Sequence, residues 1–274
     1  MNPALVITSP QNPRVKEVVK LRKRGHRDTH SSILIEGYRE VKRAVESRWP
    51  VSVLFYCPEH FIGENEGDLL ELCRSAGVEL IECAPPVFEK MAYRDRPEGL
   101  LALGAPVAGT LDDLHLGASP LVVIAEAIEK PGNLGSLLRS ADAAGVDAVI
   151  VCDPLTDINN PNVVRSSVGT LFTLPVVQAE AGATLAWCRA QRLAVLAATP
   201  EASLEYTEAD MTRGVAIVVG TEKFGLSDLW MGGADVQVRI PMLGKIDSLN
   251  VTCAATILLY EAVRQRRAGS LRKN

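Results

Sequence analysis

The stretch from Leu121 to Val151 reads LVVIAEAIEKPGNLGSLLRSADAAGVDAVIV, and it sets the fold class of the chain. Leu121–Ala125 is a continuous apolar run, which is typical of a strand covered on both faces. A helical segment, Asn133–Ala144, follows it and stops at Gly145, and Ala148–Val151 repeats the apolar strand pattern. Strand, helix and strand in this order predict a parallel unit with a helical crossover.

The same alternation continues toward the C-terminus. It predicts four further strands, at Leu174–Val177, Leu193–Ala197, Val215–Val219 and Val236–Ile240, with helices between them. A long helix, Ser248–Arg267, closes the chain. Repeated alternation of this kind predicts an α/β domain in which helices cover both faces of a parallel sheet.

The first hundred residues predict a smaller α/β domain of their own. The expected helices are Val15–Arg24, Gly37–Arg48, a segment around Leu69–Ala76 and a short one after Pro86; the expected strands are Ile33–Ile35, Val51–Tyr56, Val78–Ile81 and Leu100–Leu103. Residues 104–118 are rich in Gly, Ala and Asp and have no sustained period, which marks a linker. We therefore expect one domain over 1–105, a linker over 106–118 and a second domain over 119–274.

Composition narrows the class of protein. Of the 274 residues 47% are hydrophobic, enough for a sizeable core, yet there is no apolar run of the roughly 18 residues that a membrane helix needs. The N-terminus opens no basic-then-apolar signal peptide, so we expect a cytoplasmic protein. The six cysteines form no C-x-x-C pair and lie far apart, and the chain has only four histidines, so we expect buried free thiols and no metal.

Basic residues gather at both ends of a chain whose net charge is −4. The N-terminal group comprises Arg14, Lys16, Lys20, Arg22, Lys23, Arg24 and Arg27, with Glu17 as the one acid among them. The C-terminal group comprises Arg264, Arg266, Arg267, Arg272 and Lys273. Local excess of positive charge favours binding to a phosphate backbone, and the alternative is a solvated helix face.

Three polar clusters follow apolar strands. The first runs from Glu129 to Ser140 and opens a helix. Asn133 and Arg139 stand six residues apart in it, nearly two helical turns, so that both can lean toward one crevice at the strand ends. The alternative interpretation is that Asn133 caps the helix and Arg139 makes a surface ion pair.

The second cluster, Gly220-Thr221-Glu222-Lys223-Phe224-Gly225-Leu226, follows the strand at Val215–Val219. Two glycines bracket a polar loop that holds Glu222, and the alternative is an ordinary loop with a solvated glutamate. The third cluster runs from Ile240 to Ala254, with Gly244 expected to allow a tight turn. We expect Ser248 to cap the closing helix and to turn backbone N–H groups toward an anionic ligand group, unless the segment is only a capped core helix.

Together, the three clusters resemble the three sequence motifs of the SpoU (TrmH-like) family of RNA 2′-O-ribose methyltransferases, in order. Asn133 to Ser140 resembles N-x-G-x-x-x-R-[ST], Gly220 to Leu226 resembles G-x-E-x-x-G-[LM], and Ile240 to Val251 resembles I-P-M-x-G-x-x-x-S-L-N-V. Residues Thr8–Pro13 and Ile35–Gly37 are similar to landmarks of the family's substrate-binding domain. The resemblance implies a SPOUT fold with a C-terminal trefoil knot, a small RNA-binding domain before it, and a homodimer in which one subunit's RNA surface serves the other's cofactor site.

The resemblance also implies a reaction and a site. S-adenosylmethionine would supply a methyl group to a ribose 2′-hydroxyl of structured RNA, with ribosomal RNA favoured over transfer RNA because the chain has a separate N-terminal domain. The implied cofactor contacts are Gly220, Ile240, Met242, Ser248 and Leu249. The implied catalytic group is Arg139, Asn133, Glu222, Ser248 and Asn250, with Arg139 facing the 2′-hydroxyl. The implied RNA contacts are Arg14, Lys16, Arg22, Lys23, Arg24, Arg27 and Arg139.

Two other classes of protein fit the sequence less well. A nucleotide-dependent oxidoreductase on an ordinary doubly wound sheet needs G-x-G-x-x-G after its first strand, and this fingerprint is missing. A non-catalytic RNA-binding protein on the same fold should have lost Arg139 or the loop before Asn250, and both are present. A transfer RNA methyltransferase remains an alternative.

Overall fold

The computed structural model describes residues 5–221 and 223–271 of the chain, which forms two compact units. The first unit consists of Met1–Val107 together with Asp157–Thr173. The second consists of Ala108–Thr156 together with Leu174–Asn274. The short segment at 157–173 therefore belongs to the first unit although it lies between two strands of the second.

The second unit is built on a seven-stranded sheet. Its strands are β6 (Leu121–Glu126), β7 (Ala148–Cys152), β8 (Val176–Ala179), β9 (Ala194–Ala198), β10 (Leu204–Glu205), β11 (Val215–Val219) and β12 (Val236–Arg239). They lie in the order β10-β12-β9-β11-β6-β7-β8, and every neighbouring pair is parallel. The predicted α/β class with a parallel sheet is confirmed; the trefoil knot stays a prediction.

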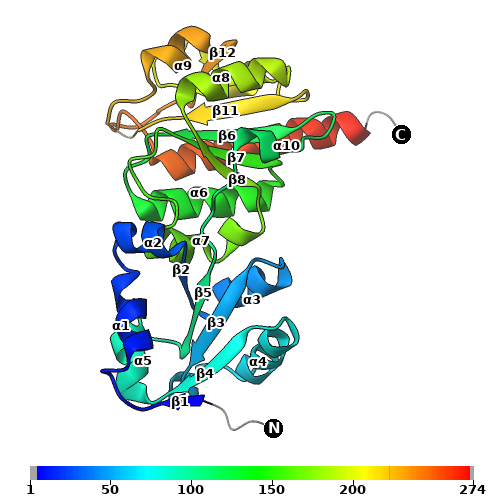
Figure 1. Ribbon diagram of the computed structural model, residues 1–274. Helices are drawn as coiled ribbons and strands as arrows, with labels where there is room; N and C mark the ends of the chain where they lie inside the picture. The colour runs from blue at the N-terminus through cyan, green and yellow to red at the C-terminus, as the bar shows by residue number, and fades with distance from the viewer. Residues whose placement is uncertain (1–4, 222, 272–274) are drawn as a thin grey trace. The chain divides into compact units, whose positions relative to one another are not determined.

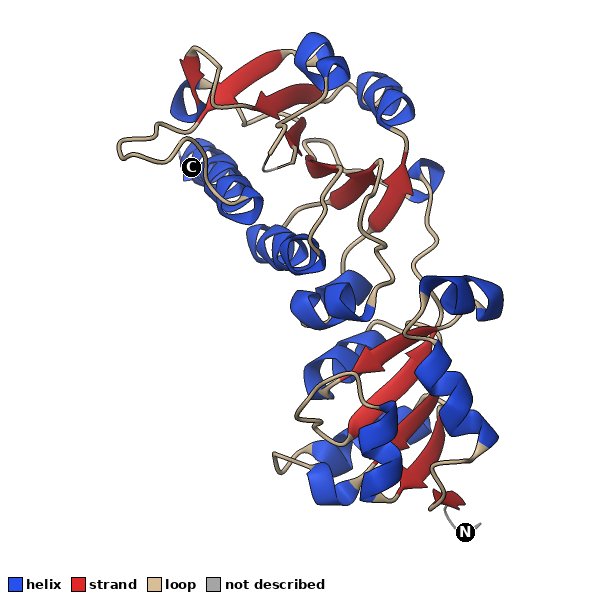
Figure 2. Cartoon of the chain, turned by 90° about the vertical axis from the view of Figure 1, so that its left-hand side faces the viewer, coloured by secondary structure: helices blue, strands red, loops and turns tan. Residues whose placement is uncertain are grey.

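Helices cover both faces of this sheet, as Figures 1 and 2 show. Two of them, α6 (Pro131–Ala144) and α10 (Val251–Leu271), run side by side on one face, joined by a 2.7 Å hydrogen bond between the hydroxyls of Ser140 and Thr256. The other face carries α8 (Ala181–Ala190) and α9 (Asp228–Gly233), whose Trp230 is fully buried in the core. Helix α6 ends at Gly145, whose φ of 68° is a left-handed conformation that glycine adopts without strain.

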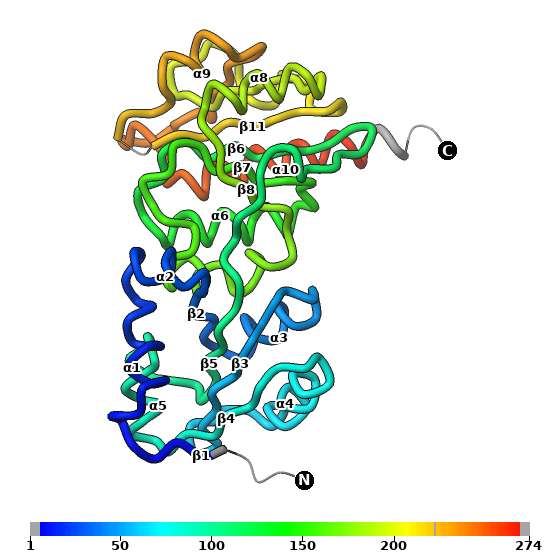
Figure 3. Tube along the Cα trace, in the orientation of Figure 1, coloured from blue at the N-terminus to red at the C-terminus, as the bar shows by residue number. Residues whose placement is uncertain are grey.

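The first unit holds a five-stranded mixed sheet in the order β1-β4-β3-β5-β2, which can be followed along the tube in Figure 3. Its strands are β1 (Leu5–Ile7), β2 (Ile33–Glu36), β3 (Val51–Tyr56), β4 (Glu79–Cys83) and β5 (Leu100–Gly104). Its helices are α1 (Pro13–Lys20), α2 (Arg24–His30), α3 (Tyr38–Glu46), α4 (Glu66–Ser75), α5 (Pro85–Met91) and α7 (Pro161–Ser167).

The predicted helix Val15–Arg24 is wrong, because the chain forms two helices with a break between Lys20 and Arg24. The buried guanidinium of Arg27 explains the break. It donates hydrogen bonds to the backbone oxygens of Leu21 and Arg22, each at 2.9 Å, so carbonyls that a continuous helix would use are satisfied by a side chain.

The segment 157–173 is held to the first unit by polar contacts that its own residues supply. Arg27 forms an ion pair with Asp157, and Arg43 donates to the backbone oxygen of Val168. Asn162 Nδ2 lies 2.9 Å from the hydroxyl of Tyr93. The predicted boundaries at 105 and 118 stay predictions, and sequence pattern alone did not indicate this segment.

Burial of ionisable groups is concentrated in the first unit. Arg94 donates to Glu40 and Glu98 and to the backbone oxygen of Glu36. Burial raises the pKa of Glu36 and of Glu40, against the lowering effect of their hydrogen bonds and of Arg94.

Five of the six free cysteines are buried, as expected, whereas Cys253 is exposed. Burial raises the pKa of Cys57 to about 11 and that of Cys152 to about 12, so these thiols are poor nucleophiles. Among the helices that the structure describes, none combines the length and apolar character needed to cross a membrane.

Candidate active site

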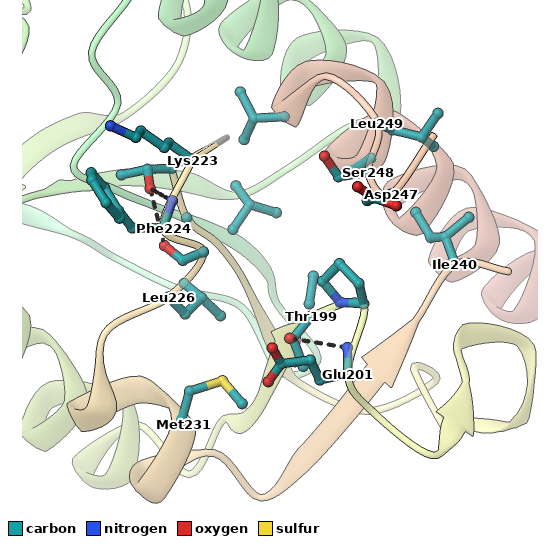
Figure 4. Close-up of a pocket in the computed structure, with 18 of the residues that line it drawn as sticks. Thr199, Glu201, Lys223, Phe224, Leu226, Met231, Ile240, Asp247, Ser248 and Leu249 are labelled. Carbon is teal, nitrogen blue, oxygen red and sulfur yellow. Dashed lines mark hydrogen bonds between the residues drawn. The ribbon is translucent and has the colours of Figure 1, made fainter. Parts of the chain in front are cut away.

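A cavity of about 630 Å³ opens in the second unit where β9, β11 and β12 end (Figure 4). These three strands are neighbours in the sheet, and β11 pairs on its other side with β6, where the strand order reverses direction. Parallel sheets bind ligands at the carboxyl ends of their strands, beside such a reversal. The volume lies within the range that holds a nucleotide-sized molecule.

All five residues predicted as cofactor contacts line this cavity, namely Gly220, Ile240, Met242, Ser248 and Leu249. They come from the loop after β11 and from the long connection between β12 and α10, so two of the three sequence clusters meet here. That these residues contact a cofactor stays a prediction.

The loop after β11 has its shape because of close backbone packing at Gly220. A Cβ atom on Gly220 would lie 2.3 Å from the backbone oxygen of Gly225. Thr221 and Gly225 exchange two backbone hydrogen bonds of 3.0 and 3.1 Å, and Gly225 has a φ of 67°. Both bracketing glycines are therefore required by the fold of the loop.

Gly244 does not have the role expected for it. A Cβ atom on Gly244 would meet nothing within 4 Å, and its φ lies outside the left-handed region. The turn that the sequence pattern predicted at this glycine therefore does not depend on the lack of a side chain. The neighbouring Leu243 is 97% exposed, so its side chain is hardly covered by the described residues.

The walls of the cavity differ in chemistry. Leu226, Met231 and Ile240 give it an apolar side, whereas the carboxyl groups of Glu201, Asp228 and Asp247 belong to its polar lining. Figure 4 shows Thr199 and Glu201 at the end of β9, with Asp247, Ser248 and Leu249 forming another wall. Such a cavity suits a ligand that combines a flat apolar ring with hydroxyl groups or positive charge.

Asn250, rather than Ser248, caps helix α10, which corrects the expectation for Ser248. The side-chain oxygen of Asn250 accepts a 3.0 Å hydrogen bond from the backbone N–H of Thr252, the usual contact of an N-cap residue. Ser248 lies before the helix and lines the cavity instead. Its hydroxyl is thus available to a ligand.

The first and third clusters are joined through two asparagines. Asn250 Nδ2 donates to Asn133 Oδ1 at 3.2 Å, and the Thr252 hydroxyl donates to the backbone oxygen of Asn133 at 3.0 Å. Asn133 also lines a small recess of about 130 Å³ that shares Thr221, Lys223 and Val251 with the main cavity. Asn133 lies inside α6 and does not cap it, because Lys130 occupies the N-cap position.

Arg139, one of the predicted catalytic residues, is not brought to the cavity. Arg139 is exposed on α6 and lines neither the cavity nor the recess. Within the part of the chain that the structure describes, no hydrogen bond or ion pair holds its guanidinium, so the surface ion pair considered as an alternative is not formed. Glu222 lies outside the described residues.

The basic residues of the first unit divide into exposed and structural ones. Lys16, Lys23 and Arg24 are exposed on or beside α1 and α2, and Arg14 is exposed and forms an ion pair with Glu79. Arg27 is 3% exposed and paired with Asp157, so its predicted RNA contact is wrong.

Arg22 is exposed as a residue, yet its guanidinium donates to the backbone oxygens of Lys90 and Ala92 and so caps α5. At the other end of the chain, Arg266 donates to four backbone oxygens, and burial lowers its pKa. Arg272 and Lys273 lie outside the described residues. The C-terminal basic group is therefore partly structural.

Sequence reasoning missed two contributors to the site. The segment Thr199–Glu201 lines the cavity, and its place directly after an apolar strand was the available signal. Glu126, at the carboxyl end of β6, is buried and accepts hydrogen bonds from the backbone N–H and the hydroxyl of Ser227, at 2.9 and 2.6 Å. Glu126 thus fixes the end of the loop that follows β11.

Comparison with known proteins agrees with this geometry. The profile of the SpoU rRNA methylase family matches residues 120–260, which is more than half of the chain. The chain belongs to the SpoU rRNA methylase family. A second profile, that of the MRM3-like substrate-binding domain, matches residues 12–102 of this SpoU-family chain.

Relatives align along nearly the whole chain. A 23S rRNA (uridine(2479)-2′-O)-methyltransferase of Streptomyces viridochromogenes is 36% identical over 90% of this chain and 87% of its own. The crystal structure of an RNA 2′-O ribose methyltransferase is 41% identical, with a TM-score of 0.84 over 96% of this chain and 100% of that one. The SpoU methyltransferase AviRb from Streptomyces viridochromogenes, solved in complex with AdoMet, is 32% identical, with a TM-score of 0.85 over 94% and 99% of the two chains.

Proposed function

We propose that this SpoU-family protein transfers a methyl group from S-adenosylmethionine to a ribose 2′-hydroxyl of 23S ribosomal RNA. The observation that carries the proposal is the convergence of Gly220, Ile240, Met242, Ser248 and Leu249 on one cavity at the strand ends. Relatives of similar length bear the names of 23S rRNA 2′-O-methyltransferases. The cytoplasmic location stays a prediction.

The lining of the cavity fits S-adenosylmethionine. The adenine ring has an apolar face that matches Leu226, Ile240 and Leu249, while the ribose hydroxyls and the positive charges find acceptors in Glu201, Asp228 and Asp247. When bound, the cofactor supplies an electrophilic methyl group. The loop after β11 and the connection before α10 would hold it in place, and the buried Glu126 accepts two hydrogen bonds from Ser227 at the end of the first of these loops.

The remaining site residues would orient the RNA and the attacking oxygen. Asn133 and Asn250 form one hydrogen-bonded pair beside the cavity, so they would act as a unit. Positioning of reacting groups contributes about 7–11 kcal/mol in favourable cases, enough for the protein to act mainly by alignment.

Arg139 is assigned to the RNA side of the reaction. A guanidinium offers several hydrogen-bond donors and no acceptor, so we assign Arg139 to binding an adjacent phosphate and stabilising the developing alkoxide. Proton removal then falls to water or to a phosphate oxygen.

We include a homodimer in the proposal, because within one chain Arg139 lines neither the cavity nor the small recess. A second copy of the chain would bring its own RNA surface to the cofactor cavity. Several large apolar side chains of the second unit are exposed, among them Leu243 at 97%, Phe224 at 74% and Ile246 at 62%. Surfaces of this kind are commonly covered in an assembly.

Replacing Leu249 by Asp tests the cofactor assignment. The change puts a carboxylate among Ile240, Met242 and Val251, where an unpaired charge is costly, so S-adenosylmethionine binding measured by calorimetry should be lost. Circular dichroism and sedimentation show whether the variant stays folded. A folded variant that binds the cofactor with wild-type affinity contradicts the assignment.

A second experiment distinguishes the substrates. The purified protein is incubated with labelled S-adenosylmethionine and total RNA, and the modified nucleotide is mapped. Methylation at a 2′-hydroxyl of 23S rRNA is expected. Methylation of transfer RNA alone would support the alternative substrate, and RNA binding without methyl transfer would support a non-catalytic protein.

A further inference from the structure

The first unit carries a cluster of metal-ligand side chains that the proposed reaction does not use. Glu17 from α1 and His26 and His30 from α2 place one ligand atom each within 4.8 Å of the others. Among the described residues, this is the one group of three or more such side chains at that spacing.

The two histidines face the same way because they lie four residues apart on α2. Positions four apart in a helix lie one above the other, and the two rings have their centroids 4.2 Å apart. The break between Lys20 and Arg24 turns the chain so that α1 presents Glu17 to this face of α2. His26 Nε2 consequently lies 2.9 Å from Glu17 Oε2.

The two carboxylate oxygens of Glu17 have different partners. Its Oε1 accepts a 2.7 Å hydrogen bond from Lys20, and its Oε2 faces His26. Lys20 thereby holds the carboxylate in place and leaves Oε2 directed at the histidines. His30 and Glu17 are exposed, so an ion can reach the cluster from solvent.

We propose that Glu17, His26 and His30 form a binding site for a divalent transition-metal ion of the Zn²⁺ class. Two imidazoles and one carboxylate are a ligand set that Zn²⁺ takes, with a fourth position left for water or another oxygen. Around a tetrahedral Zn²⁺ with bonds of 2.0–2.1 Å, ligand atoms stand about 3.3 Å apart. Side-chain rotation alone can close the remaining gap, since the ligand atoms already lie within 4.8 Å.

A bound ion would act on the segment that is expected to meet RNA. It would link α1 to α2 across the break between Lys20 and Arg24, because its ligands come from both helices. It would also add positive charge near the exposed Lys16 and Lys23. An open coordination position would suit a phosphate oxygen. The metal site itself does not depend on the proposed methyl transfer.

The test uses untagged full-length protein carrying Cys253→Ser, because Cys253 is the one exposed thiol among the six cysteines and would compete for the ion. Zn²⁺ is titrated by calorimetry, and Co²⁺ is added in parallel to follow its visible absorption. One ion per chain is expected. His30→Ala and Glu17→Gln should each weaken binding at least tenfold, whereas His115→Ala, at an exposed histidine of the second unit, should leave it unchanged.

Thermal unfolding gives an independent measurement. Zn²⁺ should raise the unfolding midpoint of the parent and of the His115 variant but not that of the His30 variant, because only an ion bound to the native state stabilises it. Circular dichroism confirms that each variant is folded before titration. Equal Zn²⁺ affinity in the parent and the His30 variant, or no binding with Zn²⁺ in large excess over the chain, overturns the proposal.

Discussion

At the residue scale, Gly220 shows how one missing side chain shapes the candidate site. We expect Gly220→Ala to destabilise the protein by about 1–3 kcal/mol, the usual cost of overpacking, since its Cβ would lie 2.3 Å from the Gly225 oxygen. S-adenosylmethionine binding should weaken as the loop shifts. Chemical unfolding and calorimetry measure the two effects.

Gly244→Ala is the matched control, because a Cβ atom there meets nothing within 4 Å. Its free energy of unfolding should stay within about 0.5 kcal/mol of wild type. Equal destabilisation by the two substitutions would contradict the steric argument, and the loop would then tolerate a side chain at Gly220.

Replacing Arg139 tests whether this residue serves the RNA substrate and not the binding of the cofactor. Because Arg139 is exposed and does not line the cavity, we expect Arg139→Ala to abolish methyl transfer while cofactor affinity stays nearly intact. Single-turnover methylation measures the rate of methyl transfer, and calorimetry measures the affinity for the cofactor. Arg189→Ala, at an exposed arginine of α8, serves as control and should keep activity. Near-wild-type turnover of the Arg139 variant would remove this residue from the mechanism.

At the element scale, the helix pair α1–α2 is where the basic surface can be tested. We expect replacement of Lys16, Lys23 and Arg24 by Ala to weaken RNA binding and to flatten its salt dependence. The slope should fall by about 0.7–0.9 unit for each phosphate that the variant no longer neutralises. Binding titrations across a range of salt concentrations measure this. Arg22 is left in place because its guanidinium caps α5, and its removal would disturb folding.

An unchanged salt slope would favour the interpretation of α1–α2 as a solvated face. The fold of the triple variant is checked by circular dichroism, and replacement of Lys42, Arg48 and Arg74 by Ala in the same unit is the control of equal charge. Removing the same charge elsewhere should leave the salt slope nearly unchanged, since general electrostatic attraction is screened over about 8–10 Å at ordinary ionic strength.

At the scale of the whole molecule, the proposed homodimer raises the question of whether Arg139 acts in the site of its own chain or in that of a second chain. Arg139→Ala and Leu249→Asp are each expected to be inactive. If Arg139 acts across the interface, mixing the two should restore activity, because each mixed dimer holds one intact site. Random reassortment should give about a quarter of wild-type specific activity. Methyl transfer after co-refolding is the measurement.

Tags of different size on the two variants make mixed dimers distinguishable by size from the two parent dimers. Mixed dimers without activity would place Arg139 in the site of its own chain, because every site would then carry one defect. Sedimentation of the wild-type chain tests the dimer itself.

The sequence alone determined the elements whose signal is local. Leu121–Ala125 and Val215–Val219 are apolar because both faces of a parallel sheet are covered, and the structure has strands at these positions. The five residues predicted as cofactor contacts were indicated by motif resemblance, and they line one cavity. These residues could be located from the sequence because they lie in two loops, each of which directly follows a strand.

Only the tertiary structure decided what depends on residues distant in sequence. The sequence indicated that Arg27 was one of several exposed basic residues. In the structure Arg27 is buried and pairs with Asp157, which lies 130 residues away in the sequence. The pairing of Asn133 with Asn250 and the meeting of Glu17 with His30 depend likewise on how separate helices pack. The local sequence shows whether a side chain is polar. Which residue that side chain contacts depends on how helices and strands distant in sequence pack together, and the local sequence carries no information about this packing.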